Sequence, residues 1–215
     1  RGKQAEVEET HKHSKQAPPQ LYDLTSLQRE ANSRFGFSAK NTLGLAQALY
    51  ERHKLITYPR TDSRCLPEDY LDSVNEILDR QQDWQYGAFA KEAQDKGYLQ
   101  KNKKNKRLFN NKKISDHFAI IPTSGLPGTL SEPELKIYQM IVQRFLAILF
   151  PPAVFHNTRR LSLVEQETFL TEGKILVEPG WKAVYGSKPG AGDANTLVAL
   201  PAGKLVLCKE IEQKK

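Results

Sequence analysis

The spacing of apolar residues changes at Pro151-Pro152, and this change limits the possible folds more than any other feature of the sequence. Before it, apolar residues such as Ile141 and Phe145 recur every three or four positions, which predicts helices with one buried face. After it, apolar residues alternate, as at Leu161 and Leu163, which predicts strands. The sequence therefore predicts helices before this point and β structure after it.

Signals for helix starts divide the first part of the chain. Thr25-Ser26-Leu27-Gln28 and Ser131-Glu132-Pro133-Glu134 match the capping-box pattern, in which two side chains bond the free amides of a first turn. Ser38 is suited to cap a further helix, and Pro67 to open the first turn of another. These signals predict a helical domain over residues 21–150.

The predicted β structure comes from both ends of the chain. The first twenty residues reach Pro18-Pro19, which is typical of a strand end or a linker. Residues 181–185 alternate and predict a strand near the other end. The predicted fold class is therefore α+β, with a helical domain, residues 21–150, inserted into a discontinuous β domain made of residues 1–20 and 151–215.

The amino-acid composition limits the cellular compartment and the kinds of binding partner that this chain is expected to have. The chain has 32 Lys+Arg against 25 Asp+Glu, a net charge of +7, which suits an acidic partner such as nucleic acid. No run of 18 apolar residues occurs, so no membrane span is expected. Cys65 and Cys208 form no C-x-x-C pair, which excludes a disulfide scaffold and favours a reducing, intracellular setting. His11 and His13 lie two apart, but no third metal ligand is evident.

Residues 55–63, Leu-Ile-Thr-Tyr-Pro-Arg-Thr-Asp-Ser, carry the strongest chemical signal. Pro59 favours an extended conformation at Tyr58, and alternate side chains of an extended segment share a face, which places Tyr58 with Arg60. A phenol has a pKa near 10, so its use as a nucleophile at neutral pH needs a nearby cation, which Arg60 can supply. A half-buried strand with an aromatic anchor explains the same pattern equally well.

Two further segments are candidates for binding phosphate. His117 lies between polar residues and an apolar run, although a hydrogen-bonded histidine at a strand end is the commoner outcome. Residues 100–113 contain seven positive charges and no acid, which suits nucleic-acid phosphates, but the interleaved asparagines favour a solvated loop. The basic candidates in this segment are Lys101, Lys103, Lys104, Lys106 and Arg107.

Residues 55–63 closely resemble the active-site tyrosine motif of type IA DNA topoisomerases. Residues 24–31, residues 37–40 leading into 46–51, and residues 116–123 resemble further motifs of that family, in the family's order. Pro59 and the paired isoleucines after Ala119 resemble its topoisomerase III branch.

The resemblance implies a reversible break in single-stranded DNA without ATP. Tyr58 would attack a backbone phosphate, keep the 5′ phosphate as a phosphotyrosine ester and free a 3′ hydroxyl. Arg60 and His117 would hold the phosphate. The remaining loop residues would order the loop beside the DNA: Thr61, Asp62 and Ser63.

The resemblance also implies which part of the enzyme is present. Residues 21–150 would be the helical domain that carries the tyrosine, and residues 1–20 with 151–215 an antiparallel β arch serving as the hinge of a gate. The family's toprim domain, which binds Mg²⁺ and carries a catalytic glutamate, has no counterpart in the sequence. Since the chain opens at Arg1, we expect a fragment of a longer protein, and without the toprim domain we expect it to hold no cofactor and to be inactive alone.

The implied partners are single-stranded DNA and the remaining domains of the same polypeptide, without a membrane, in the bacterial cytoplasm at the nucleoid. Three alternatives stay open. A non-catalytic single-stranded nucleic-acid-binding module fits the net charge. A tyrosine-recombinase-like transferase would link its tyrosine to a 3′ phosphate instead. An interaction protein would bind no DNA. The sequence leaves the oligomeric state open.

Overall fold

The computed structural model describes residues 4–190 and 206–207, so Cys208 lies outside the described part. The fold is mixed α and β and divides into two compact units. The sheet unit lies within Arg1–Gln16, Pro152–Ala183 and Ser187–Lys215, and the helical unit within Ala17–Pro151 and Val184–Gly186. The mixed α and β content agrees with the prediction, whereas the predicted insertion and its boundaries stay a prediction.

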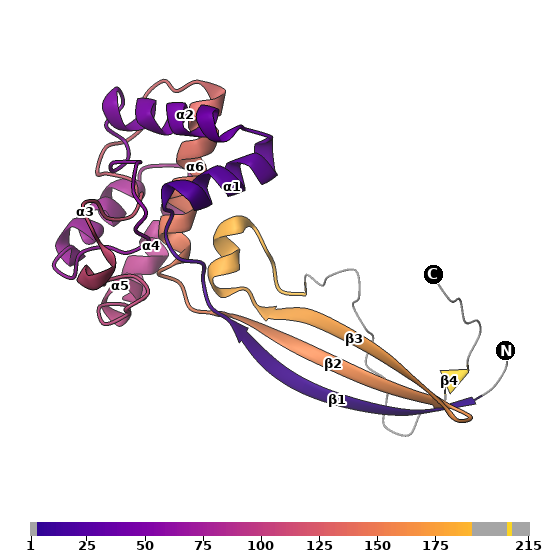
Figure 1. Ribbon diagram of the computed structural model, residues 1–215. Coiled ribbons are helices and arrows are strands. Elements are labelled where there is room, and N and C mark those ends of the chain that lie inside the picture. Colours follow the sequence, from indigo (N-terminus) through magenta and orange to yellow (C-terminus); the bar gives the residue numbers. More distant parts are fainter. Residues whose placement is uncertain (1–3, 191–205, 208–215) are drawn as a thin grey trace. The chain divides into compact units, whose positions relative to one another are not determined.

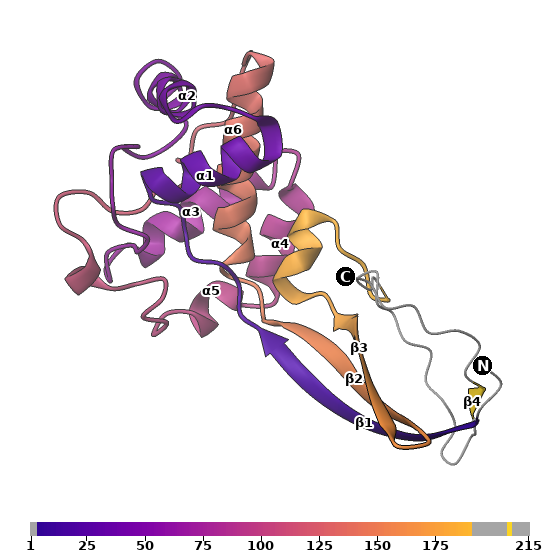
Figure 2. The same ribbon diagram turned by 45° about the vertical axis from the view of Figure 1, so that its right-hand side comes forward.

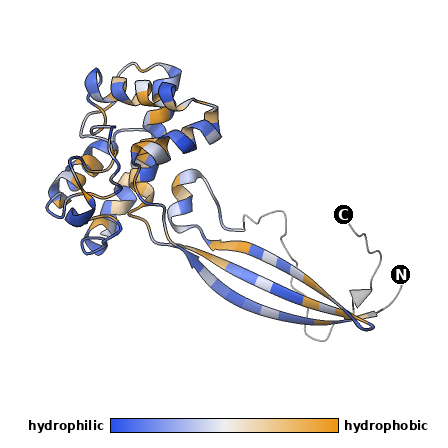
Figure 3. Cartoon of the chain, in the orientation of Figure 1, coloured by the Kyte–Doolittle hydropathy of each residue, from blue (hydrophilic) through white to orange (hydrophobic). Residues whose placement is uncertain are grey.

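The sheet unit contains three long strands that lie side by side (Figure 1). β2 (Ala153–Val164) pairs antiparallel with both β1 (Gln4–Gln16) and β3 (Glu167–Glu178). The short β4 (Val206–Leu207) pairs with the start of β1, which gives the strand order β3-β2-β1-β4. Figure 3 shows that the middle of β1 is hydrophilic, so the sheet has little apolar surface to bury there.

A small apolar cluster lies at one end of the sheet, where Ala153, Phe155 and Leu176 are buried beneath Trp181. The strand predicted at residues 181–185 is wrong, because Gly180–Tyr185 forms the 3₁₀ helix η2. Gly180 has φ 49° and the Lys182 amide donates to the Pro179 carbonyl at 2.9 Å, so the chain coils at the end of β3 instead of extending.

The helical unit contains six α-helices within the described residues. α6 (Glu132–Ala147) runs through its middle (Figure 2) and buries Tyr138, Ile141, Val142 and Phe145, as its spacing predicted. Within the described residues no helix has the length and apolar character to cross a membrane. The other helices are α1 (Leu24–Phe35), α2 (Ala39–Glu51), α3 (Leu71–Gln81), α4 (Gly87–Asp95) and α5 (Tyr98–Lys101).

Capping interactions set the helix boundaries. Ser38 caps α2 as predicted, its hydroxyl accepting the Asn41 amide at 3.1 Å. The capping box predicted for α1 at Thr25 and Gln28 is wrong, because the Asp23 carboxylate accepts the Ser26 amide at 2.7 Å. An ionised carboxylate is a stronger acceptor than a hydroxyl, so the helix begins earlier.

The start of α3 also differs from the prediction. Pro67 does not open the helix, because the Tyr70 amide donates to the Pro67 carbonyl at 3.1 Å and closes a separate turn before Leu71. The sequence pattern also did not predict α4 and α5, which are short.

The capping box of α6 is confirmed and links this helix to the end of α2. The buried Glu134 carboxylate accepts from the Ser131 hydroxyl at 2.6 Å and amide at 2.9 Å. It also forms an ion pair with Arg52 and lies 3.3 Å from the Nε2 atom of His53, within hydrogen-bond distance. The bonds from Ser131, followed by those from Arg52 and His53, lower the pKa of Glu134 to about 2.

We expect Glu134→Gln to destabilise the protein by about 1–2 kcal/mol at pH 7. Because folding lowers this pKa, the contribution is complete above the unfolded pKa of about 4.5 and is lost as the pH falls toward 2. Urea unfolding at pH 7 and pH 3 measures the effect, and the difference from wild type should shrink at pH 3. Glu132→Gln, on an exposed side chain of the same turn, is the control. Equal differences at both pH values would contradict this role.

Candidate active site

The two motifs singled out in the sequence form one structural element. The Thr57 amide donates to the Ile121 carbonyl at 3.0 Å, and the Thr57 hydroxyl accepts the Ile121 amide at 3.0 Å. The same hydroxyl donates to the Ala119 carbonyl, 62 residues away in sequence, at 2.9 Å. Ile56 and Pro122 form an antiparallel bridge beside these bonds. The loop that carries Tyr58 is therefore held in register with the segment that carries His117.

This register brings the side chains of Tyr58 and His117 together. The centroids of their rings are 4.3 Å apart, with an angle of 46° between the ring planes. The Thr61 hydroxyl donates to the His117 carbonyl at 2.8 Å and fixes the backbone at the histidine. Tyr58 is partly exposed and His117 is exposed, so both rings can be reached from solvent. Their catalytic roles stay predictions.

One face of α2 holds both Tyr58 and Arg60. The ring of Tyr50 meets the ring of Tyr58 edge-on, with centroids 5.4 Å apart. With its amide oxygen turned toward Arg60, Gln47 accepts from the guanidinium Nη2 at 3.1 Å and Nε at 3.3 Å. Residues three apart on a helix share a face, so Gln47 and Tyr50 link the phenol to the guanidinium through one rigid element.

The sequence pattern assigned no role to Gln47 or Tyr50. Their spacing of three residues within α2 is the one signal that could have paired them with the loop, and it does not identify what the helix face contacts.

The residues after Arg60 are mostly engaged within the protein. Thr61 and Ser63 are buried, and the Ser63 amide donates to the Thr61 hydroxyl at 3.1 Å. Asp62 is exposed and accepts from the Ser115 hydroxyl at 3.3 Å. These bonds tie the loop to itself and to the segment that carries His117, while contacts of its residues with DNA stay a prediction.

The basic segment is folded more tightly than a solvated loop. It contains the end of α5, several turns and the 3₁₀ helix η1 (Asn111–Lys113), and it is anchored by the buried Leu108 and Phe109. Lys106 forms an ion pair with Glu68 at 2.9 Å, and this bond lowers the pKa of that carboxyl. An acid distant in sequence therefore neutralises part of the segment.

The other predicted cations of this segment differ in their surroundings. Arg107 donates to the Pro18 carbonyl at 2.8 Å, and Lys101 lies 5.4 Å from the centroid of the Tyr98 ring. Lys103 and Lys104 are exposed. The three lysines outside the Glu68 ion pair are therefore the better candidates for phosphate contacts.

Comparison with known proteins gives a consistent result along the chain. A family model described as DNA topoisomerase matches residues 1–215. DNA topoisomerase 3 of Bacillus subtilis is 44% identical over 187 residues, which cover 86% of this chain and 25% of that protein. DNA topoisomerase 3 of Bacillus licheniformis is 46% identical over 187 residues, with the same coverage. The chain thus spans about a quarter of the length of these curated relatives.

A solved structure supports the fold. Full-length topoisomerase I from Thermotoga maritima matches with a TM-score of 0.64 and 23% identity, covering 95% of this chain and 33% of that one. At this identity the likeness concerns the fold alone.

Proposed function

This chain belongs to the DNA topoisomerase family, type IA, in its topoisomerase III branch, and from this premise we propose that it carries the nucleophile that cleaves single-stranded DNA. The observation that carries the proposal is the contact between the rings of Tyr58 and His117, whose centroids are 4.3 Å apart, with Tyr58 on the loop that also carries Arg60. The helical unit would carry the tyrosine, and the sheet unit would serve as the hinge of the gate.

In the proposed reaction the Tyr58 hydroxyl oxygen attacks a backbone phosphorus. The phenol gives up its proton, the phosphorus–O3′ bond breaks, the 5′ phosphate stays on the tyrosine, and the 3′ oxygen takes up one proton and leaves as a hydroxyl, so the number of protons is unchanged overall. One phosphodiester replaces another, so resealing needs no ATP. The Arg60 guanidinium would hold two phosphate oxygens, and His117 would contact the phosphate from beside the phenol ring.

Magnesium is implied for the intact enzyme, and the residues described here do not fit a site for it. Within residues 4–190 and 206–207, no group of three acid, histidine or cysteine side chains is arranged to hold a metal ion. His11 and His13 do gain a third imidazole, His156, with ring centroids 5.0 and 5.2 Å away, but the rings pack against one another. We therefore derive no metal-dependent step from this chain and propose that other domains of the polypeptide bind Mg²⁺.

The proposal is tested by His117→Asn in the intact enzyme. Loss of a phosphate contact should slow formation of the covalent adduct about 10²-fold in a single turnover on saturating single-stranded DNA. His13→Asn, on an exposed histidine of the sheet unit, is the matched control and should react at the wild-type rate. Equal rates for His117→Asn and the control, with both proteins folded, would remove His117 from the site.

A further inference from the structure

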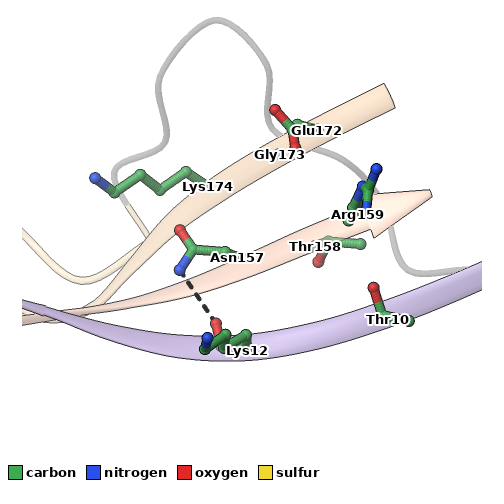
Figure 4. A pocket seen from close by; sticks show the side chains of 8 residues that line it. All are labelled: Thr10, Lys12, Asn157, Thr158, Arg159, Glu172, Gly173 and Lys174. Carbon is green, nitrogen blue, oxygen red and sulfur yellow. Dashed lines mark hydrogen bonds between the residues drawn. The ribbon is translucent and has the colours of Figure 1, made fainter. Parts of the chain in front are cut away.

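The sheet unit carries a second cationic site that the Tyr58 loop does not use. One face of the sheet has a pocket of about 490 Å³ (Figure 4). The strand register places Lys12, Asn157 and Lys174 in one row across the three strands, with Arg159 in the next row. Among the described residues that line the pocket, Glu172 is the one acid. Positive charge therefore predominates there.

The row has a shape suited to an extended anion. Asn157 has a short side chain that is bound to the neighbouring strand β1. Its amide donates to the Ser14 hydroxyl at 2.7 Å and to the Lys12 carbonyl at 3.2 Å. Lys12 and Lys174 lie on the strands either side of it, so two long cationic side chains flank a low, polar centre. Paired strands are about 4.8 Å apart, which places the two lysine backbones about 10 Å from each other.

A third lysine approaches the same face from η2. The Nζ atoms of Lys174 and Lys182 lie 4.0 and 5.7 Å from the centroid of one ring, that of Phe155. Both ammonium groups therefore lie near one buried ring, which attracts cations, and both add positive charge to this part of the sheet unit. A bound anion would be attracted by both.

We propose that this face of the sheet binds the phosphodiester backbone of a nucleic-acid strand, as a contact separate from the Tyr58 loop. The proposal rests on the proposed function in taking DNA as the ligand. The face offers separated cations and a polar centre, which suits successive phosphates of a strand.

The test measures binding of a fluorescein-labelled oligothymidylate to the 215-residue chain by anisotropy at several salt concentrations. Each phosphate contact on a single strand contributes about −0.7 to the slope of log K against log salt. The double variant Lys12→Gln/Lys174→Gln should therefore bind about tenfold more weakly near physiological salt, with a slope shallower by about 1.4. Lys15→Gln is the matched control, because Lys15 is exposed on β1 and points to the opposite face.

Equal slopes for the double variant and the control would overturn the proposal. Acetylation of the wild-type chain gives a second measurement that does not depend on variants, since bound oligonucleotide should protect Lys12 and Lys174 more than Lys15. If the chain binds no oligonucleotide while the intact enzyme still forms its covalent adduct, the sheet site is wrong and the proposed function stands. If the intact enzyme forms no adduct either, the proposed function fails.

Discussion

The intact enzyme with Tyr58→Phe should form no covalent adduct with single-stranded DNA and relax no supercoiled DNA. The change removes one hydroxyl and keeps the ring that contacts Tyr50 and His117, so the fold and the loop should be preserved. Removing a catalytic nucleophile has cost about 10⁶-fold in rate in another enzyme, which puts the residual reaction below detection. Denaturing gel electrophoresis of labelled DNA after reaction measures the adduct.

Tyr50→Phe is the matched control, because its ring touches that of Tyr58 and the change again removes one hydroxyl. This variant should still form the adduct. Adduct formation by Tyr58→Phe, or its loss only in Tyr50→Phe, would contradict the assignment. If Tyr58→Phe binds single-stranded DNA as wild type does and wild type forms no adduct, the chain is a non-catalytic binding module.

The 215-residue chain by itself should not relax supercoiled DNA, with or without Mg²⁺. Phosphoryl transfer needs positioned cations and a proton donor for the departing 3′ oxygen. No metal-binding cluster exists among the described residues, and the family resemblance places the acids and the catalytic glutamate in another domain. Agarose gels of plasmid treated with the chain measure this outcome, with the intact enzyme as the positive control. Robust Mg²⁺-dependent relaxation by the chain would show that it holds a complete active site.

Much of the fold was predictable, because local periodicity and capping act over a few residues. The buried face of α6 and the caps at Ser38 and Ser131 follow directly from the sequence. The errors arose where two local signals compete. Asp23 caps α1 in place of Thr25, since a carboxylate is the better acceptor. Gly180 has a left-handed conformation and begins the 3₁₀ helix η2, which an alternating sequence pattern does not reveal.

The sequence predicted which residues belong to the candidate site, but it did not predict the contacts between them. Sequence motifs identified Tyr58 and His117 separately, and the bonds between their segments join positions about sixty residues apart. The spacing of apolar residues does not indicate such contacts between distant segments, because these contacts depend on tertiary packing. For the same reason the sequence did not indicate that Gln47 faces Arg60, or that Glu68 neutralises Lys106.

The central claim is that Tyr58 takes the 5′ phosphate of the broken strand, and mapping the trapped adduct tests it most directly. Trypsin cleaves after Lys54 and Arg60, so the peptide 55–60 contains Tyr58 as its single tyrosine. After nuclease treatment of the adduct formed by the intact enzyme, mass spectrometry should find this peptide joined to a nucleotide through its 5′ phosphate. In the same reaction, a label at the 3′ end of the DNA should stay with the protein, and a label at the 5′ end should be released. A nucleotide on another peptide, or a link through a 3′ phosphate, would contradict the claim.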